Sequence, residues 1–240
     1  TAPLNPDAFK AQFSSLLEEE GVVGAQLVIF NDKEITLEHY HGLSQKSPDI
    51  GVNADTLFRA GSTTKTFVAL AIMQLINQGH FNLHTKLSEL APEIEVTNPW
   101  ADSHPIKVIH LLTHTAGFDD MHFKNIYNHT SESVTTLESI NRDKEALEVR
   151  WQPGKHHAYA NPGYGILGYL IEKQTKQSFD EYITEQIIAP LNIQNTQFGY
   201  KAGPQQTLSH GFSNGEFVEN NEIYLAAAGN LSIPAKGIAQ

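Results

Sequence analysis

The sequence contains no cysteine, so it can form neither disulfide bonds nor metal sites with thiolate ligands. Basic residues are also scarce: 16 Lys and Arg stand against 27 Asp and Glu, which gives a net charge of −11. This balance argues against binding to nucleic acids or to anionic membrane surfaces. No apolar run approaches the roughly 20 residues that a transmembrane helix requires, so we expect no membrane span.

The chain has 240 residues, enough to bury a substantial core in one large domain or in two interleaved lobes. It begins Thr1-Ala2-Pro3 without methionine, which indicates that a leader or a tag was removed. A chain without cysteine suits an oxidising compartment. We therefore expect a periplasmic or secreted location.

Turn residues and hydrophobic periodicity predict helices and strands in one chain. The first helix is expected from Asn5-Pro6-Asp7 to Gly21, followed by two antiparallel strands at 22–30 and 35–40. A helix packed on such a hairpin is typical of the α+β class. Further helices are expected at 66–76, 83–90, 106–112, 137–149, 164–174 and 179–188, and strand-like pieces at 211–212 and 217–218.

These elements predict two lobes. Residues 1–60 together with 191–240 would form an incomplete α/β sheet lobe, and residues 61–190 would form a helical lobe. We expect the active site at the junction of the two lobes. The helix at 66–76 is apolar on most faces, which predicts a central position in the core.

Ser62 and Lys65 stand one helical turn apart at the start of that apolar helix, and no other Ser-x-x-Lys spacing occurs in the chain. Positions i and i+3 share a helix face, so the amine can reach the hydroxyl. Burial and the positive end of the helix dipole both disfavour the ammonium, and a neutral amine can take the serine proton. The alternative is an N-cap serine followed by a solvated lysine. The position at the edge of a core favours catalysis.

Tyr159-Ala160-Asn161 is a second candidate element. Flanking Pro and Gly residues predict a rigid loop rather than a helix interior. A phenol held near a lysine can relay a proton, and an asparagine amide offers a donor and an acceptor to a substrate amide. A tyrosine packed on a helix and an asparagine bonded to its own backbone are the alternative.

Four segments resemble motifs of the serine β-lactamase and penicillin-binding protein superfamily, most closely its class C β-lactamase and related esterase branch. The stretch at 57–65 is similar to the nucleophile segment, and Tyr159-Ala160-Asn161 is similar to the Tyr-x-Asn motif. Leu-Leu-Thr-His-Thr-Ala-Gly at 111–117 resembles Leu-Leu-x-His-x-Ser-Gly, with alanine in place of serine. Residues 190–196 resemble the Pro-Leu-Gly-Met segment. The resemblance covers the chain from about Phe9 to its end.

This resemblance implies a β-lactamase-like fold and acyl transfer without a cofactor. Ser62 would attack a carbonyl, Lys65 and Tyr159 would share the proton transfers, and Asn161 would orient the substrate. Water would then release the acyl group. The substrate would be a β-lactam, a D-amino-acid peptide or a simple ester, and the residues leave open whether lysine or tyrosine is the first base.

The superfamily also has a Lys-x-Gly or His-x-Gly motif on a strand beside the active site. The chain's only candidate is Lys201-Ala202-Gly203, which precedes Pro204 and stands too early. Ala228-Gly229-Asn230-Leu231 resembles the Gly-Gly-Leu segment that normally comes before that strand. We therefore expect a chain that lacks the last strands of the sheet, and a partner or swapped dimer that could cover the gap. Loss of one oxyanion-hole donor costs about 10²–10³ in rate, so the isolated chain should be impaired.

Twelve histidines raise the question of a metal site. His110 and His114 are four apart but lack the glutamate of a zincin helix, and we expect no metal. His114 is expected to brace a turn. Two rival functions stay open: a non-catalytic homologue that only binds a ligand in the same pocket, and an inactive fragment that needs a C-terminal segment.

Overall fold

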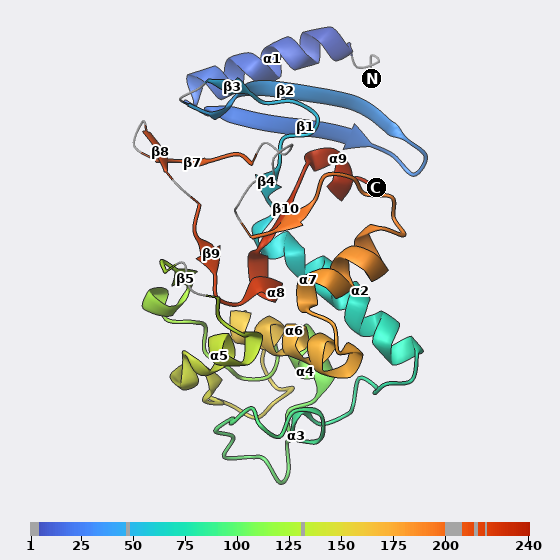
Figure 1. Ribbon diagram of the computed structural model, residues 1–240, viewed down its shortest axis with the longest axis vertical. Coiled ribbons are helices and arrows are strands. Elements are labelled where there is room, and N and C mark those ends of the chain that lie inside the picture. Colours follow the sequence, from blue (N-terminus) through green and yellow to red (C-terminus); the bar gives the residue numbers. More distant parts are fainter. Residues whose placement is uncertain (1–4, 47–48, 131–132, 200–207, 214–215, 219) are drawn as a thin grey trace. The chain divides into compact units, whose positions relative to one another are not determined.

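The computed structural model divides the chain into two compact units (Figure 1). Unit 1 comprises Thr1–Arg59, Ile193–Asn220 and Ser232–Gln240, and unit 2 comprises Ala60–Asn192 and Asn221–Leu231. Residues 221–231 thus group with the helical unit, whereas we expected them in the sheet lobe. The structure describes residues 5–46, 49–130, 133–199, 208–213, 216–218 and 220–240.

In unit 1, helix α1 (Pro6–Glu19) begins where the sequence predicts it. The Asn5 side chain accepts hydrogen bonds from the backbone N–H groups of the first turn, and the following proline has no N–H to satisfy. Gly21 ends the helix with a φ of +69°, a conformation that glycine adopts without strain. Ser14 Oγ lies 2.7 Å from His39 Nε2, which attaches the helix to the sheet beside it.

The first sheet has the order β1-β2-β3, with antiparallel pairing throughout. Its strands are β1 (Gly24–Phe30), β2 (Ile35–Gln45) and β3 (Ile50–Gly51). The two predicted strands are confirmed, and the second runs five residues further than expected, to Gln45. Within the described residues, β1 pairs only with β2, so its other edge has no strand beside it.

Other strands of unit 1 come from distant parts of the chain. A second sheet has the order β4-β10-β6, so a strand that follows the first sheet in sequence pairs with a strand near the C-terminal end of the chain. Strands β7 and β8 form a separate hairpin. The bounds are β4 (Phe58–Arg59), β6 (Gln197–Phe198), β7 (Gly211–Ser213), β8 (Glu216–Val218) and β10 (Leu231–Ile233). Helix α9 (Ala235–Ile238) contacts β1, and its first backbone N–H donates to Gln26 Oε1 at 2.7 Å.

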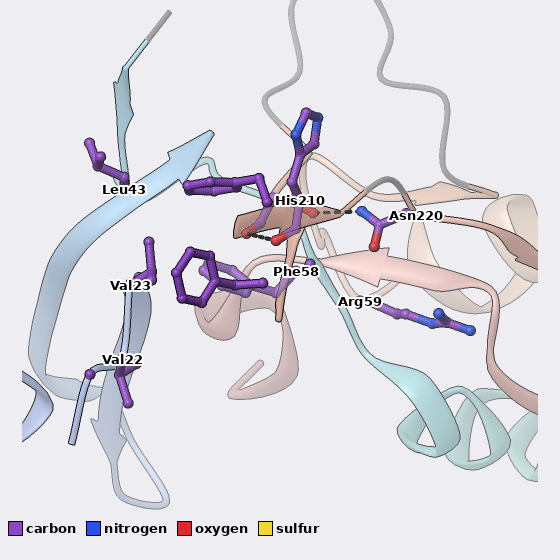
Figure 2. Close-up of a pocket in the computed structure, with 13 residues that line it drawn as sticks. Val22, Val23, Leu43, Phe58, Arg59, His210 and Asn220 are labelled. Atoms are coloured by element: carbon purple, nitrogen blue, oxygen red, sulfur yellow. Dashed lines mark hydrogen bonds between the residues drawn. The ribbon is translucent and has the colours of Figure 1, made fainter. Parts of the chain in front are cut away.

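Unit 1 also contains a pocket of about 500 Å³ between β1 and the β7–β8 hairpin (Figure 2). Its wall is mainly apolar, with Val22, Val23 and Leu43 on the side of the first sheet and Phe58 facing them. None of the residues that the sequence analysis proposes for catalysis lines this pocket.

Unit 2 is mostly helical within the described residues. Its α-helices are α2 (Thr64–Asn77), α3 (Leu87–Leu90), α4 (Val108–Leu112), α5 (Thr136–Asn141), α6 (Asn161–Thr175), α7 (Phe179–Ile183) and α8 (Ala226–Gly229). Short 3₁₀ turns occupy Gly61–Thr63, Phe123–Asn125 and Lys144–Leu147, and a π-helical turn, Thr184–Ile188, extends α7. Strands β5 (Tyr127–Asn128) and β9 (Glu222–Ile223) form an antiparallel pair.

Helix α6 is the centre of unit 2, because it packs against α2, α4, α5, α7 and α8. We expected the apolar helix at 66–76 to take this place, and that prediction was wrong in part. On α2, Leu70 and Met73 are each 47% exposed, whereas one face of the helix is buried. Apolar composition alone did not show which helix is surrounded.

Small residues allow α8 to approach α6 closely. A Cβ atom on Gly165 would lie 2.7 Å from Leu225, and one on Gly168 would lie 2.7 Å from Ala227. Such distances are too short for real contacts. Gly229 is similarly placed against the backbone of Gly61, at 3.3 Å. The run of small residues at 226–229 therefore packs on both α6 and the turn that precedes α2.

The helix predicted at 137–149 is wrong in length. Helix α5 ends at Asn141, and a separate 3₁₀ turn follows. Asp143 lies between the two, with an extended φ of −130°. Its buried carboxylate accepts hydrogen bonds from the backbone N–H and the imidazole of His122, at 2.7 and 2.8 Å. This tertiary contact competes with helix continuation.

Candidate active site

Ser62 lies on the 3₁₀ turn that leads into α2, and its side chain is exposed. Gly61 begins this turn with a φ of +53°, which explains the glycine before the serine. The Thr64 hydroxyl donates to the Gly61 carbonyl at 2.7 Å, and the Ala60 N–H donates to the Leu231 carbonyl at 2.9 Å. The turn is thus fixed by hydrogen bonds on both sides of the serine.

Lys65 is the second residue of α2 and is only 6% exposed. Its Nζ atom lies 3.1 Å from Ser62 Oγ, 2.8 Å from Asn161 Oδ1 and 2.7 Å from the Ala228 carbonyl oxygen. The last two atoms can only accept hydrogen bonds. A neutral amine has two N–H groups, which these two acceptors would occupy. Its lone pair would then be left to accept the hydroxyl proton of Ser62.

Burial lowers the pKa of Lys65, because the ammonium loses hydration in the protein interior. Tyr159 and Asp120 act in the opposite direction and raise it, but the net direction is downward. The structure therefore gives the amine the environment that the sequence analysis expected of a proton acceptor.

Tyr159 reaches the same serine from the segment before α6. Its hydroxyl donates to Ser62 Oγ at 2.8 Å, and its ring centroid is 5.0 Å from Lys65 Nζ. The side chain is 44% exposed, so the phenol stands at the boundary with solvent. The serine hydroxyl thus lies between an amine and a phenol, each within hydrogen-bonding distance.

His114 supports the tyrosine. The imidazole stacks on the Tyr159 ring with centroids 4.3 Å apart, and its Nδ1 accepts the Ala160 N–H at 3.2 Å. Burial and the nearby Lys65 lower the pKa of His114, which favours the neutral ring that this hydrogen bond requires. The residue adopts a φ of +55°, and its contact with Tyr159 was not predicted.

Asn161 is the first residue of α6 rather than part of a loop, so the predicted helix at 164–174 starts three residues too late. The sequence analysis took Pro162 as a loop residue. Proline is in fact favourable in the first turn of a helix, because its fixed φ suits that turn. The Asn161 side chain joins two groups: Oδ1 accepts from Lys65, and Nδ2 donates to Asp120 at 3.0 Å.

The sequence analysis missed two parts of this constellation, Asp120 and the Ala228 carbonyl. Asp120 closely follows the Leu-Leu-x-His segment, which is the one signal that could have suggested it. A backbone carbonyl has no side-chain identity, so no residue type points to Ala228. Both become visible only when α6 and α8 are placed next to α2.

Two other features bear on the predictions. Within the part of the chain that the structure describes, no group of three or more His, Asp or Glu residues is placed to hold a metal ion, and no helix is long and apolar enough to cross a membrane. The tripeptide Lys201-Ala202-Gly203 lies outside the described residues.

Comparison with known proteins decides the family. The family model described as Beta-lactamase matches residues 9–239. The chain belongs to the Beta-lactamase family. This confirms the resemblance that the motifs indicated, and the helices and antiparallel sheets confirm the α+β, β-lactamase-like fold class.

The chain also resembles individual proteins in sequence or in fold. A protein named beta-lactamase from Yersinia enterocolitica is 28% identical over 225 residues, which cover 94% of this chain and 54% of that protein. The octameric penicillin-binding protein homologue from Pyrococcus abyssi superposes with a TM-score of 0.82 at 24% identity, covering 98% of this chain and 55% of that one. A class C beta-lactamase crystallised with cefoxitin gives 0.79 at 22% identity, covering 97% and 63%. The chain thus spans about half the length of the Yersinia protein, and 36% of the length of other relatives that it matches in sequence.

Proposed function

We propose that this member of the Beta-lactamase family is a serine hydrolase that acts on an ester or an amide through an acyl-enzyme. In this proposal Ser62 is the nucleophile, Lys65 and Tyr159 transfer protons, and Asn161 orients the substrate. One observation carries the proposal: Ser62 Oγ lies 3.1 Å from Lys65 Nζ and 2.8 Å from the Tyr159 hydroxyl. Activation of a serine needs a proton acceptor at this distance.

The proposed reaction has two steps. In the first, Ser62 Oγ bonds to the substrate carbonyl carbon and loses its proton either to a neutral Lys65 or to a Tyr159 phenolate. The same pair returns the proton to the leaving group as the ester or amide bond breaks. In the second step, water bonds to the acyl carbon and gives one proton to Lys65 or Tyr159. That proton passes to Ser62 Oγ as the bond between Ser62 and the acyl group breaks and the acid departs.

The substrate class is proposed as a β-lactam, a D-amino-acid peptide of the cell-wall type, or a simple ester. Support for a β-lactam comes from the Yersinia relative's name and from the cefoxitin complex of the class C neighbour. The Pyrococcus neighbour is described as a penicillin-binding protein homologue, which supports a penicillin as the first probe.

The test is covalent labelling of this chain with a fluorescent penicillin and with a fluorophosphonate, followed by mass spectrometry. The proposal expects one acyl or phosphonyl adduct on Ser62, and no adduct in Ser62→Ala. Ser15→Ala serves as the control, because that exposed serine lies on α1 and its hydroxyl donates to Glu19 Oε1 at 3.3 Å. The control should label like the wild type.

The labelling experiment also separates the rival functions. A binding homologue would bind the penicillin reversibly, and Ser62→Ala would leave the affinity unchanged. An inactive fragment would give no adduct alone but would label after the C-terminal part of a longer family member is added. Absence of labelling under every condition would overturn the proposed function.

We propose in addition a periplasmic or secreted location, and an assembly of two or more chains. The location is supported by the absence of cysteine, and fractionation of the native host tests it. The assembly is supported by the unpaired edge of β1 among the described residues and by the octameric state of the Pyrococcus homologue. Gel filtration with light scattering would detect it.

A further inference from the structure

Asp120 is a partly exposed carboxylate whose hydrogen bonds are concentrated on Asn161. Its Oδ1 atom accepts the Asn161 backbone N–H at 2.9 Å and the Asn161 side-chain amide at 3.0 Å. The same amide lies 3.2 Å from Oδ2, and the Met121 backbone N–H donates to Oδ1 at 2.9 Å. Both the start of α6 and its first side chain are thus attached to one carboxylate.

This arrangement determines which way the Asn161 amide points. A carboxylate only accepts hydrogen bonds, so Asp120 requires the NH₂ side of the amide. The carbonyl side, Oδ1, then faces Lys65 Nζ at 2.8 Å. The reversed amide would direct Oδ1 at the carboxylate and NH₂ at the amine, which are two unfavourable contacts. Asp120 therefore selects the orientation in which Lys65 keeps its acceptor.

The carboxylate also acts on Lys65 through its charge. The amine is faced by Tyr159 and Tyr164, with ring centroids 5.0 and 5.6 Å from Nζ, and by His114, which stacks on Tyr159. Among the groups that shift the pKa of Lys65, Asp120 is the one carboxylate, and it raises that pKa against the effect of burial. Without this negative charge the ammonium would be less favourable still.

We propose that Asp120 is a positioning residue of this site, which acts through the Asn161 amide to hold the acceptor of Lys65 and to keep the amine aligned with Ser62. The kinetic part of this inference rests on the proposed function. A competing explanation is that Asp120 only stabilises the N-terminus of α6, where a negative charge is favourable. The two explanations differ in what they predict for the protonation of Lys65.

The test compares Asp120→Asn with Asp119→Asn. Asp119 is the adjacent carboxylate; its Oδ1 pairs with Arg150 at 3.0 Å and accepts the Asp120 backbone N–H at 2.9 Å, a hydrogen bond that the asparagine oxygen can still accept. The protonation of Lys65 is followed by NMR of lysine side chains labelled at Cε, with the Lys65 signal assigned by its loss in Lys65→Met. Acylation by the fluorescent penicillin is measured against pH on the same proteins.

In Asp120→Asn, the Lys65 pKa should fall by roughly half to one unit, since a nearby opposite charge is removed. The acid limb of the acylation profile should move to lower pH by the same amount. The plateau should fall about tenfold to a hundredfold, because the amide no longer has one fixed orientation. Asp119→Asn should leave the Lys65 pKa and the plateau unchanged, and Asp120→Glu should restore the pKa.

A Lys65 pKa that is equal in Asp120→Asn and the wild type would overturn the inference, even if thermal stability falls. If Asp120→Asn does not fold, Asp120→Glu decides through the plateau. The charge is kept, so the Lys65 pKa should stay as in the wild type, and a plateau that also equals the wild type contradicts a positioning role. If no probe acylates the wild type, the proposed function fails. The NMR titration still gives a result for Asp120 in that case.

Discussion

Two lysines of unit 2, Lys65 and Lys173, share a hydrogen-bond partner with a tyrosine, but their partners differ in charge. Lys173, on α6, donates both to Glu93 Oε1 at 2.7 Å and to Glu93 Oε2 at 2.8 Å, and the Tyr169 hydroxyl donates to the same carboxylate. Lys65 is bonded to a hydroxyl, an amide oxygen and a backbone carbonyl, none of which carries a charge.

The consequences for protonation follow from this difference. Partial burial raises the pKa of Glu93, but hydrogen bonds from Lys173 and Tyr169 outweigh it and bring the pKa to about 2. Burial and the Glu93 hydrogen bond raise the pKa of Tyr169 to about 12. Near neutral pH the Glu93 carboxyl is therefore ionised, and the Tyr169 phenol keeps its proton. Among the described residues no carboxylate makes a hydrogen bond with Lys65, and burial lowers the pKa of its amine.

The largest difference in acylation rate should appear between the variants that each remove one of the two lysines. Lys65→Met removes the candidate proton acceptor, so we expect acylation to fall by about 10²–10⁴-fold. Lys173→Met removes an ion pair outside the site and should stay within about twofold of the wild type. Single-turnover labelling with the fluorescent penicillin measures both. Equal losses in the two variants would contradict the distinction between the lysines.

Variants that lack the hydroxyl of Tyr159 or of Tyr169 should differ less in their acylation rate than the two lysine variants. In Tyr159→Phe, the 2.8 Å hydrogen bond to Ser62 Oγ is lost, and acylation should fall by about 10²-fold, the lower range for a group that transfers protons. Tyr169→Phe should leave the rate unchanged, since its hydroxyl bonds only Glu93 in the contacts described above. A Tyr159→Phe protein with the wild-type rate would assign the whole proton transfer to Lys65.

The smallest effect should appear in stability. Glu93→Gln removes the ion pair, whose side chains are about a third exposed (30% for Lys173 and 32% for Glu93), so solvent screening limits the loss to about 1 kcal/mol at neutral pH. Because the folded pKa of about 2 lies below the usual glutamate value of 4.5, the stabilisation is full above about pH 4.5. It disappears as the pH falls through about 2.

Urea unfolding of Glu93→Gln and the wild type across this pH range measures that difference. The two unfolding free energies should converge in acid. A difference that stays constant down to the lowest pH would show that Glu93 acts through packing, and the lysine comparison would then lose its electrostatic basis.

Local sequence signals predicted the parts of the site that depend on spacing. Ser62 and Lys65 are one turn apart, and α2 begins where the apolar run begins, so the amine could be placed near the hydroxyl without a structure. The pairing of this turn with Tyr159, 97 positions away, came from the resemblance of the motifs. The roles of these residues stay predictions until the labelling is done.

Contacts between segments that are distant in sequence could not be predicted from residue spacing. Asp120 and the Ala228 carbonyl reach the site only through the packing of α6 and α8, and no periodicity reports such packing. The start of α6 at Asn161 was missed because proline was taken as a loop signal. The break after α5 was missed because its cause, the contact between Asp143 and His122, spans 21 positions.

The absence of side chains at Gly165 and Gly168 allows a close packing on which one contact of Lys65 depends. Helix α8 carries the Ala228 carbonyl, which accepts a hydrogen bond from Lys65. Gly165 packs directly against Leu225, and Gly168 packs directly against Ala227. A methyl group added to Gly168 would meet the Cβ atom of Ala227, which has no rotamer to move to, so the backbone before Ala228 should shift. The hydrogen bond from Lys65 to the Ala228 carbonyl therefore depends on how small the residues in the middle of α6 are.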